Sequence, residues 1–342
     1  MPAVPSLRPA AQWLQRLSTI RHTEAKVTIG LDIGSTAIKA VALGMRKGAA
    51  QRPILGQNLV PLPTGQETTD ISELIRSTIH TLQVPARSIN LSVSGQWVIM
   101  RIVEMPTMKS GEMKQALPFE AQRYLPFNVQ DVVIDGAVLG PAEGNKSWVL
   151  IVACKKDLIE RRLDWVKRAG FDVAVIDVDA LAVANAFLND TNGHRPGETF
   201  AIINAGAQLT NVVIFRGESP YLVRDIPWGA AKLWRHLADQ LGTEVEAVTA
   251  ELSQGSSRPE LLAALKVASE SLMTELQLSF DYFENRFGQP PEQVLVSGGL
   301  SQSEPFMNLV KGQLTQPVTA WAPMKGLSGQ FTVAYGLALR TS

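Results

Sequence analysis

A short segment occurs twice in this chain, and the repetition restricts the folds that its 342 residues can adopt. Residues 29–36 (IGLDIGST) align without gaps with residues 201–208 (AIINAGAQ), and the alignment pairs Asp32 with Asn204. In both copies an apolar run, a short turn and a second apolar run follow one another, which is the pattern of a β-hairpin. The repeat therefore predicts an α/β protein built from two related lobes that face each other.

Apolar periodicity over the rest of the chain predicts strands that alternate with helices. The predicted strands are 27–33, 37–43, 54–60, 89–94, 98–104, 132–139, 147–153, 172–176, 199–204, 210–215, 221–226 and 293–296. The predicted helices are 71–82, 112–124, 157–169, 179–188, 230–241, 244–252, 259–286 and 304–314. Pro118 removes one backbone donor and is expected to bend or restart its helix. Asn, Gly and Pro crowd together between residues 190 and 197, which we interpret as the boundary between the lobes.

The bulk composition argues against several classes of protein. Apolar residues make up 45% of the chain and charged residues 19%, so the chain is expected to fold. Lys plus Arg equals Asp plus Glu at 32 each, so no net field attracts nucleic acid or an anionic membrane. One cysteine and four scattered histidines do not form the cluster that a zinc site needs.

Residues 1–25 are expected to form an N-terminal tail. Trp13, Leu14, Leu17 and Ile20 recur at helical spacing, so the tail either lies on a membrane surface or stays loosely docked. The first residues lack the apolar core of a signal peptide, and no stretch approaches the ~20 apolar residues that cross a bilayer. A cytoplasmic location is therefore expected.

The first hairpin turn carries side chains suited to a nucleotide phosphate. A strand that ends in Asp-x-Gly exposes successive backbone N–H groups, which can bind phosphate oxygens. Ser35 and Thr36 add hydroxyl donors, Asp32 can hold Mg²⁺ directly or through water, and Lys39 adds a positive charge. One such turn alone is equally well explained by a glycine that serves backbone geometry. The second hairpin turn and the Ser-Gly-Gly turn at 297–299 favour the phosphate interpretation, because together they can clamp phosphates and approach an adenine ring.

These motifs resemble those of a known superfamily. Residues 31–39 (LDIGSTAIK), the second turn and residues 296–299 (VSGG) are similar to the two phosphate motifs and the adenosine motif of the actin-like ATPases. Further motifs resemble the PilM family of that superfamily, and they are MPTM at 105–108, FEAQRYLPF at 119–127, AGF at 169–171, IDVD at 176–179 and AYGLALR at 334–340. The resemblance runs from about residue 27 to residue 340.

The resemblance implies an actin-like fold with a nucleotide cleft between the lobes. It implies a first lobe at 26–190 with a small α+β subdomain inserted at about 105–140, and a second lobe at 198–342. It implies ATP and Mg²⁺ as cofactors, with Asp32 as the metal ligand. The nucleotide-binding residues that it implies are Asp32, Gly34, Ser35, Thr36, Lys39, Asn204, Gly206, Ala207, Thr210, Gly229, Glu251, Glu275, Ser279, Gly298 and Gly299.

The resemblance also implies a role and a partner. Members of the PilM family assemble type IV pili and receive the cytoplasmic N-terminal peptide of PilN, a membrane protein that acts with PilO. The implied contacts are Glu120, Arg123, Tyr124 and Phe127, although each aromatic residue taken singly is better explained as core of the small subdomain. The chain is accordingly expected at the inner face of the inner membrane, attached through its partner. Its oligomeric state, a homo-oligomer included, stays open.

The second lobe departs from the family pattern. Asn204 stands where an Asp is usual, and an amide is not a general base. Ala230 replaces the second Gly of a Gly-Gly pair, Gln254 replaces a Lys, and Leu278 replaces an Arg. We therefore expect ATP binding with weak or absent hydrolysis. An active ATPase and a filament-forming protein similar to FtsA remain the alternatives.

Overall fold

The computed structural model describes residues 27–45, 51–63, 70–190 and 197–341. The predicted tail and most of the predicted boundary between the lobes lie outside the described residues.

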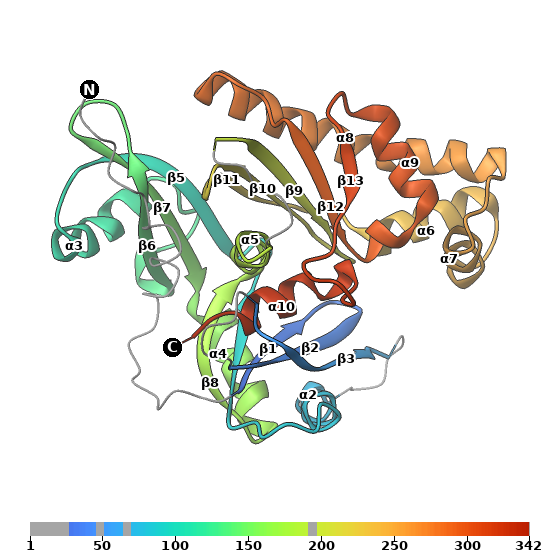
Figure 1. The fold of residues 1–342 in the computed structure, drawn as a ribbon, viewed down its shortest axis with the longest axis horizontal. Helices are drawn as coiled ribbons and strands as arrows, with labels where there is room; N and C mark the ends of the chain where they lie inside the picture. The colour runs from blue at the N-terminus through green and yellow to red at the C-terminus, as the bar shows by residue number, and fades with distance from the viewer. Residues whose placement is uncertain (1–26, 46–50, 64–69, 191–196, 342) are drawn as a thin grey trace.

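Two five-stranded sheets form the centres of the two lobes (Figure 1). The first contains β1 (Val27–Ile33), β2 (Ala37–Gly44), β3 (Ile54–Pro61), β4 (Ser88–Val93) and β8 (Asp172–Val178). The second contains β9 (Thr199–Ala205), β10 (Thr210–Arg216), β11 (Ser219–Ile226), β12 (Gln293–Gly298) and β13 (Val318–Ala320). Their orders, β3-β2-β1-β4-β8 and β11-β10-β9-β12-β13, correspond strand by strand, with three antiparallel strands followed by two parallel ones. The predicted pair of related α/β lobes is confirmed.

Helices cover the outer face of each sheet. The first sheet shares an apolar core with α2 (Ile71–His80) and α4 (Lys156–Arg168). The second shares a core with α6 (Ala230–Leu241), α7 (Val245–Ser253), α8 (Pro259–Phe287) and α9 (Glu304–Gln313). Buried residues recur along these helices at the spacing of one apolar stripe, which explains why one side of each faces a sheet.

Two further helices lie between the lobes, α5 (Asp179–Leu188) and α10 (Thr332–Ala338) (Figure 1). They pack so closely that a methyl group on Gly336 would overlap the carbonyl oxygen of Ala182. Gly30 of β1 permits an equally close approach to Ala334 of α10. Although α10 falls in the range 198–342, it therefore packs on the first sheet, and one apolar core includes residues of both sheets.

A third sheet, β5-β7-β6, stands beside the second lobe and carries α3 (Ser110–Ala121) on one face (Figure 1). Its strands β5 (Val98–Pro106), β6 (Val132–Pro141) and β7 (Lys146–Lys155) extend beyond 105–140 on both sides. α3 continues through Pro118 without a restart. The proline lies in the last turn, so the single i→i−4 hydrogen bond that it cannot donate is lost near the end of the helix. No helix in the described part of the chain is long and apolar enough to span a bilayer.

Candidate functional site

The turns between β1 and β2 and between β9 and β10 have the same geometry. The amide of Gly34 donates to the carbonyl oxygen of Ala37 at 3.1 Å, and the amide of Gly206 donates to that of Leu209 at 3.0 Å. A Cβ atom on Gly34 or Gly206 would lie 2.9 or 2.8 Å from the same oxygen. Both turns therefore need glycine for close approach of the backbone.

The next two amides of each turn are available to a ligand. The N–H groups of Ser35, Thr36, Ala207 and Gln208 have no hydrogen-bond acceptor among the described residues. Ser35 and Thr36 are also exposed. Paired turns with free amides have the chemistry that holds the oxygens of a polyphosphate.

The two hairpins differ in charge at matching positions. Asp32 and Lys39 are cross-strand partners, and the Lys39 ammonium donates to the Asp32 carboxylate at 2.9 Å. The corresponding partners of the second hairpin are Asn204 and Asn211, whose side chains form a hydrogen bond of 2.8 Å. An ion pair in the first lobe is therefore replaced by an amide pair in the second.

A buried carboxylate that is not among the predicted nucleotide-binding residues lies close to Asp32 and Asp225. Asp179 begins α5 and accepts a hydrogen bond of 2.6 Å from Ser92. Burial and then the negative charge of Asp32 raise the pKa of Asp179 to about 7, with a smaller contribution from Asp225. Asp179 lies in the first turn of α5 and does not cap the helix, because the N-cap position is Val178 and no side-chain cap hydrogen bond is formed there.

A guanidinium group completes this end of the cleft. Arg162 of α4 donates to the carbonyl oxygen of Ile33 at 3.1 Å, directly before the first turn. Burial lowers the pKa of Arg162, and the carboxylates of Asp179 and Asp32 oppose this shift. The buried Nε of Arg162 has no partner among the described residues, which fits an anion that is bound nearby.

The described residues do not form a complete metal site by themselves. No group of three His, Cys, Asp or Glu side chains in the described part of the chain is arranged to hold a metal ion. Asp32 can supply one oxygen, and a bound Mg²⁺ would take its other ligands from phosphate and water, as this ion commonly does.

Two adjacent glycines in the turn after β12, Gly298 and Gly299, have different surroundings. Gly298 has a φ of 85°, and a Cβ there would overlap the carbonyl oxygen of Ala205. Gly299 has no atom within 4 Å of a Cβ position, so its side faces open space. The open side of Gly299 leaves room for an adenine ring, and the predicted contact with that ring stays a prediction.

Two of the predicted nucleotide-binding residues in the second lobe, Thr210 and Gly229, stabilise the structure around the second turn. The Thr210 hydroxyl is buried and donates to the carbonyl oxygen of Trp228 at 3.0 Å. A Cβ on Gly229 would lie 2.5 Å from the carbonyl oxygen of Ala207, so glycine lets α6 begin directly against the turn.

Three other predicted contacts form bonds inside the second lobe. Glu275 and Ser279 both bind Arg224 of β11, and Ser279 is only 1% exposed. Glu251 accepts from Ser256 at 2.9 Å and pairs with Arg258 at 3.1 Å. These bonds do not test the predicted contacts with a nucleotide, so the role of the three residues remains a prediction.

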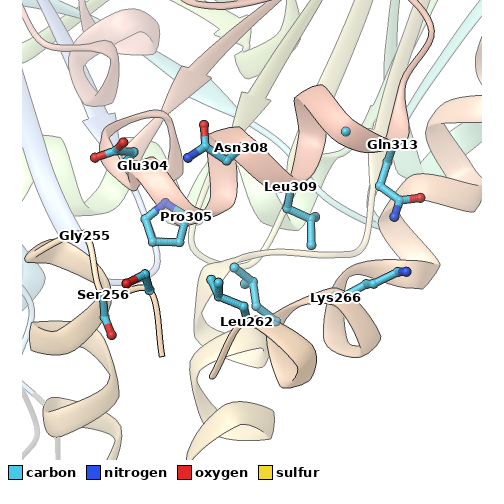
Figure 2. A pocket seen from close by; sticks show the side chains of 12 residues that line it. Gly255, Ser256, Leu262, Lys266, Glu304, Pro305, Asn308, Leu309 and Gln313 are labelled. Atoms are coloured by element: carbon cyan, nitrogen blue, oxygen red, sulfur yellow. The ribbon is translucent and has the colours of Figure 1, made fainter. Parts of the chain in front are cut away.

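A separate cavity of about 360 Å³ lies between α8 and α9 (Figure 2). Leu262 and Leu309 form its apolar middle, while Glu304 and Lys266 lie toward opposite ends. None of the predicted nucleotide-binding residues lines it.

The predicted partner residues fall into two groups. Glu120, Arg123 and Tyr124 are bonded to one another at the end of α3, with the Tyr124 hydroxyl donating to Glu120 at 3.1 Å. Tyr124 also packs against the core of the small subdomain. Phe127 instead packs against Trp97, with a distance of 5.7 Å between the ring centroids.

Comparisons with known proteins bear on the family and the fold of the chain. The family model described as type IV pilus assembly protein PilM matches residues 30–342. A solved PilM-PilN type IV pilus biogenesis complex contains a chain that is 23% identical, with a TM-score of 0.79 over 93% of this chain and 98% of that one. The ethanolamine utilization protein EutJ from Carboxydothermus hydrogenoformans is 12% identical, with a TM-score of 0.54 over 93% and 91%. Component A of (R)-2-hydroxyglutaryl-CoA dehydratase from Acidaminococcus fermentans is 14% identical, with a TM-score of 0.51 over 92% and 97%.

The structural likenesses establish the fold, and the family match establishes the relationship. The two lobes with corresponding sheets have the actin-like ATPase fold that the motifs predicted. The family match covers nearly the whole chain. The chain therefore belongs to the family of the type IV pilus assembly protein PilM.

Proposed function

We propose that this protein is a nucleotide-binding scaffold of type IV pilus assembly that holds Mg-ATP in its cleft and recruits the N-terminal cytoplasmic peptide of PilN. Through PilN it links the pilus complex of the inner membrane, which includes PilO, to the cytoplasm. Family membership supports the pilus role. The solved PilM-PilN complex supports PilN as the partner.

One observation carries the nucleotide part of the proposal. Two matching turns keep their N–H groups free, and the Arg162 guanidinium lies near the first turn with an unpaired Nε. Bound ATP would supply the negative charge that these donors lack, and Mg²⁺ would offset the charge of the phosphates beside Asp32 and Asp179. Asn204 cannot act as a base, which favours holding the nucleotide over rapid turnover.

The peptide part of the proposal rests on the surface formed by Trp97, Phe127 and Lys155, which we name the aromatic surface. Trp97 is 39% exposed, and the Lys155 ammonium lies 4.7 Å from its ring centroid and 5.0 Å from that of Phe127. Lys155 forms no ion pair with a described residue. The surface therefore fits a peptide that carries an apolar side chain beside a carboxylate.

Calorimetric titration of a PilN N-terminal peptide into the full chain tests this assignment. We expect Phe127→Ala to weaken binding by about tenfold, because it removes half of an aromatic contact. Tyr124→Phe removes only the hydroxyl that donates to Glu120 and keeps the aromatic ring in the core. The variant therefore distinguishes a role of the Tyr124 hydroxyl in peptide binding from a role of its ring in packing.

The matched control is Leu278→Ala, which truncates an exposed apolar residue on α8. It should bind the peptide as the wild type does. Unchanged affinity of Phe127→Ala would show that the peptide binds elsewhere.

A further inference from the structure

A series of side-chain and backbone hydrogen bonds connects the second hairpin with the loop that carries the aromatic surface. It begins at Asn204, whose amide donates to Asn211 at 2.8 Å, and Asn211 in turn donates to the Asp225 carboxylate at 2.8 Å. Asn204 and Asn211 are 8% and 2% exposed, so water competes little for these hydrogen bonds. The three residues come from three adjacent strands, β9, β10 and β11.

Asp225 then reaches across to the first lobe. Its second carboxylate oxygen accepts a hydrogen bond of 3.1 Å from the amide of Gly95, in the loop between β4 and β5. A Cβ on Gly95 would lie 3.4 Å from Leu209 Cδ1, so the second turn also packs beside this loop. The loop is thus fixed to the second lobe by both a polar and an apolar neighbour.

The same loop supports the aromatic surface. Trp97 follows Gly95 by two residues, and the Val98 amide closes the turn by donating to the Gly95 carbonyl oxygen at 2.9 Å. The Lys155 amide donates to the Trp97 carbonyl oxygen at 3.1 Å. A displacement of Gly95 therefore shifts the backbone that carries Trp97 and bonds to Lys155.

We propose that Asp225 is a latch between the lobes, through which a nucleotide at the second turn changes the affinity of the aromatic surface for its peptide partner. The inference rests on the proposed function for its two ligands. The latch itself is a property of the apoprotein. Asp225 acts through Gly95 and touches neither ligand, so it is a positioning residue.

Asn204 has a definite place in this arrangement. The Asn211 amide group donates to Asp225, which leaves its oxygen to accept a bond, and the Asn204 amide provides the donor. An Asp at position 204 would set an acceptor against that oxygen. The Asn204 amide is therefore the donor that lets Asn211 direct its own amide toward the Asp225 carboxylate.

Hydrogen exchange of the full chain without nucleotide tests the latch. Asp225→Ala removes the acceptor for Gly95, and we expect faster amide exchange in the peptides that cover residues 94–98 and 124–129. Glu218→Ala is the matched control, since it removes an exposed carboxylate from the turn between β10 and β11. Exchange that changes only around residue 225 would overturn the latch. If Asp225→Ala does not fold, Asn211→Ala tests the same relay from its middle.

Peptide titrations with and without saturating Mg-ATP test the coupling. In the wild type we expect the two affinities to differ by about fivefold or more, and in Asp225→Ala by less than about twofold. Asp225→Asn presents one oxygen and one NH2 group to two donors, the Gly95 N–H and the Asn211 amide, so it can keep only one of the two hydrogen bonds and should also reduce the difference. An undiminished difference in Asp225→Ala would overturn the coupling. A wild type that binds neither ligand would refute the proposed function and the coupling, whereas the exchange result decides the latch separately.

Discussion

Asp179 is the residue whose charge state depends most on the fold of the cleft. It is buried at the start of α5, and burial together with the charge of Asp32 raises its pKa to about 7. Because this value lies above that of a carboxyl in an unfolded chain, the folded state binds the proton more tightly. The resulting stabilisation is complete below about pH 4 and is lost as the pH rises through about 7.

The substitution Asp179→Asn should remove this pH dependence, since an amide resembles the protonated carboxyl at every pH. Between about pH 5 and about pH 8 the free energy of unfolding should fall more in the wild type than in the variant, by on the order of 2 kcal/mol. Urea denaturation at a series of pH values measures the difference. The control Glu218→Gln changes an exposed carboxylate and should show the same pH dependence as the wild type. If Asp179→Asn also shows the wild-type pH dependence, the pKa of Asp179 is not raised.

At the scale of elements, the predictions succeeded where the side chains have a one-sided pattern. The expected helix at 230–241 coincides with α6, whose polar and apolar residues are segregated. α10 gave no such signal because all seven of its residues are buried, and three-residue β13 is too short for alternation to show. The two hairpin turns were visible because each is contiguous in sequence. The partnership of Asp179, Asp225 and Gly95 was not, because it joins separate strands and loops.

The crossing of α5 and α10 depends on a glycine, and this can be measured. Gly336→Ala places a methyl group against the Ala182 carbonyl and should destabilise the protein by about 1–3 kcal/mol or more. Gly312→Ala in α9 is the control, because a Cβ there meets nothing within 4 Å and should leave stability unchanged or slightly raised. Equal unfolding midpoints for the two variants would contradict the close crossing.

The whole molecule combines a shared core with a divided polar cleft. One apolar cluster joins both five-stranded sheets and the third sheet through α5 and α10. The residues of the two hairpin turns, 34–36 and 206–209, are not part of this cluster. The sequence predicted the two-lobe plan from its repeat. It could not predict the return of α10 to the first sheet, which depends on contacts between chain segments about 250 residues apart.

The account is tested most directly by calorimetric titration of Mg-ATP into the full chain and into Gly299→Val. We predict saturable binding by the wild type at physiological ATP concentrations. We predict lost binding in the variant, whose added side chain fills open space beside the turn and leaves the fold intact. No heat of binding in the wild type, together with a melting temperature that Mg-ATP does not change, would contradict the nucleotide-binding cleft.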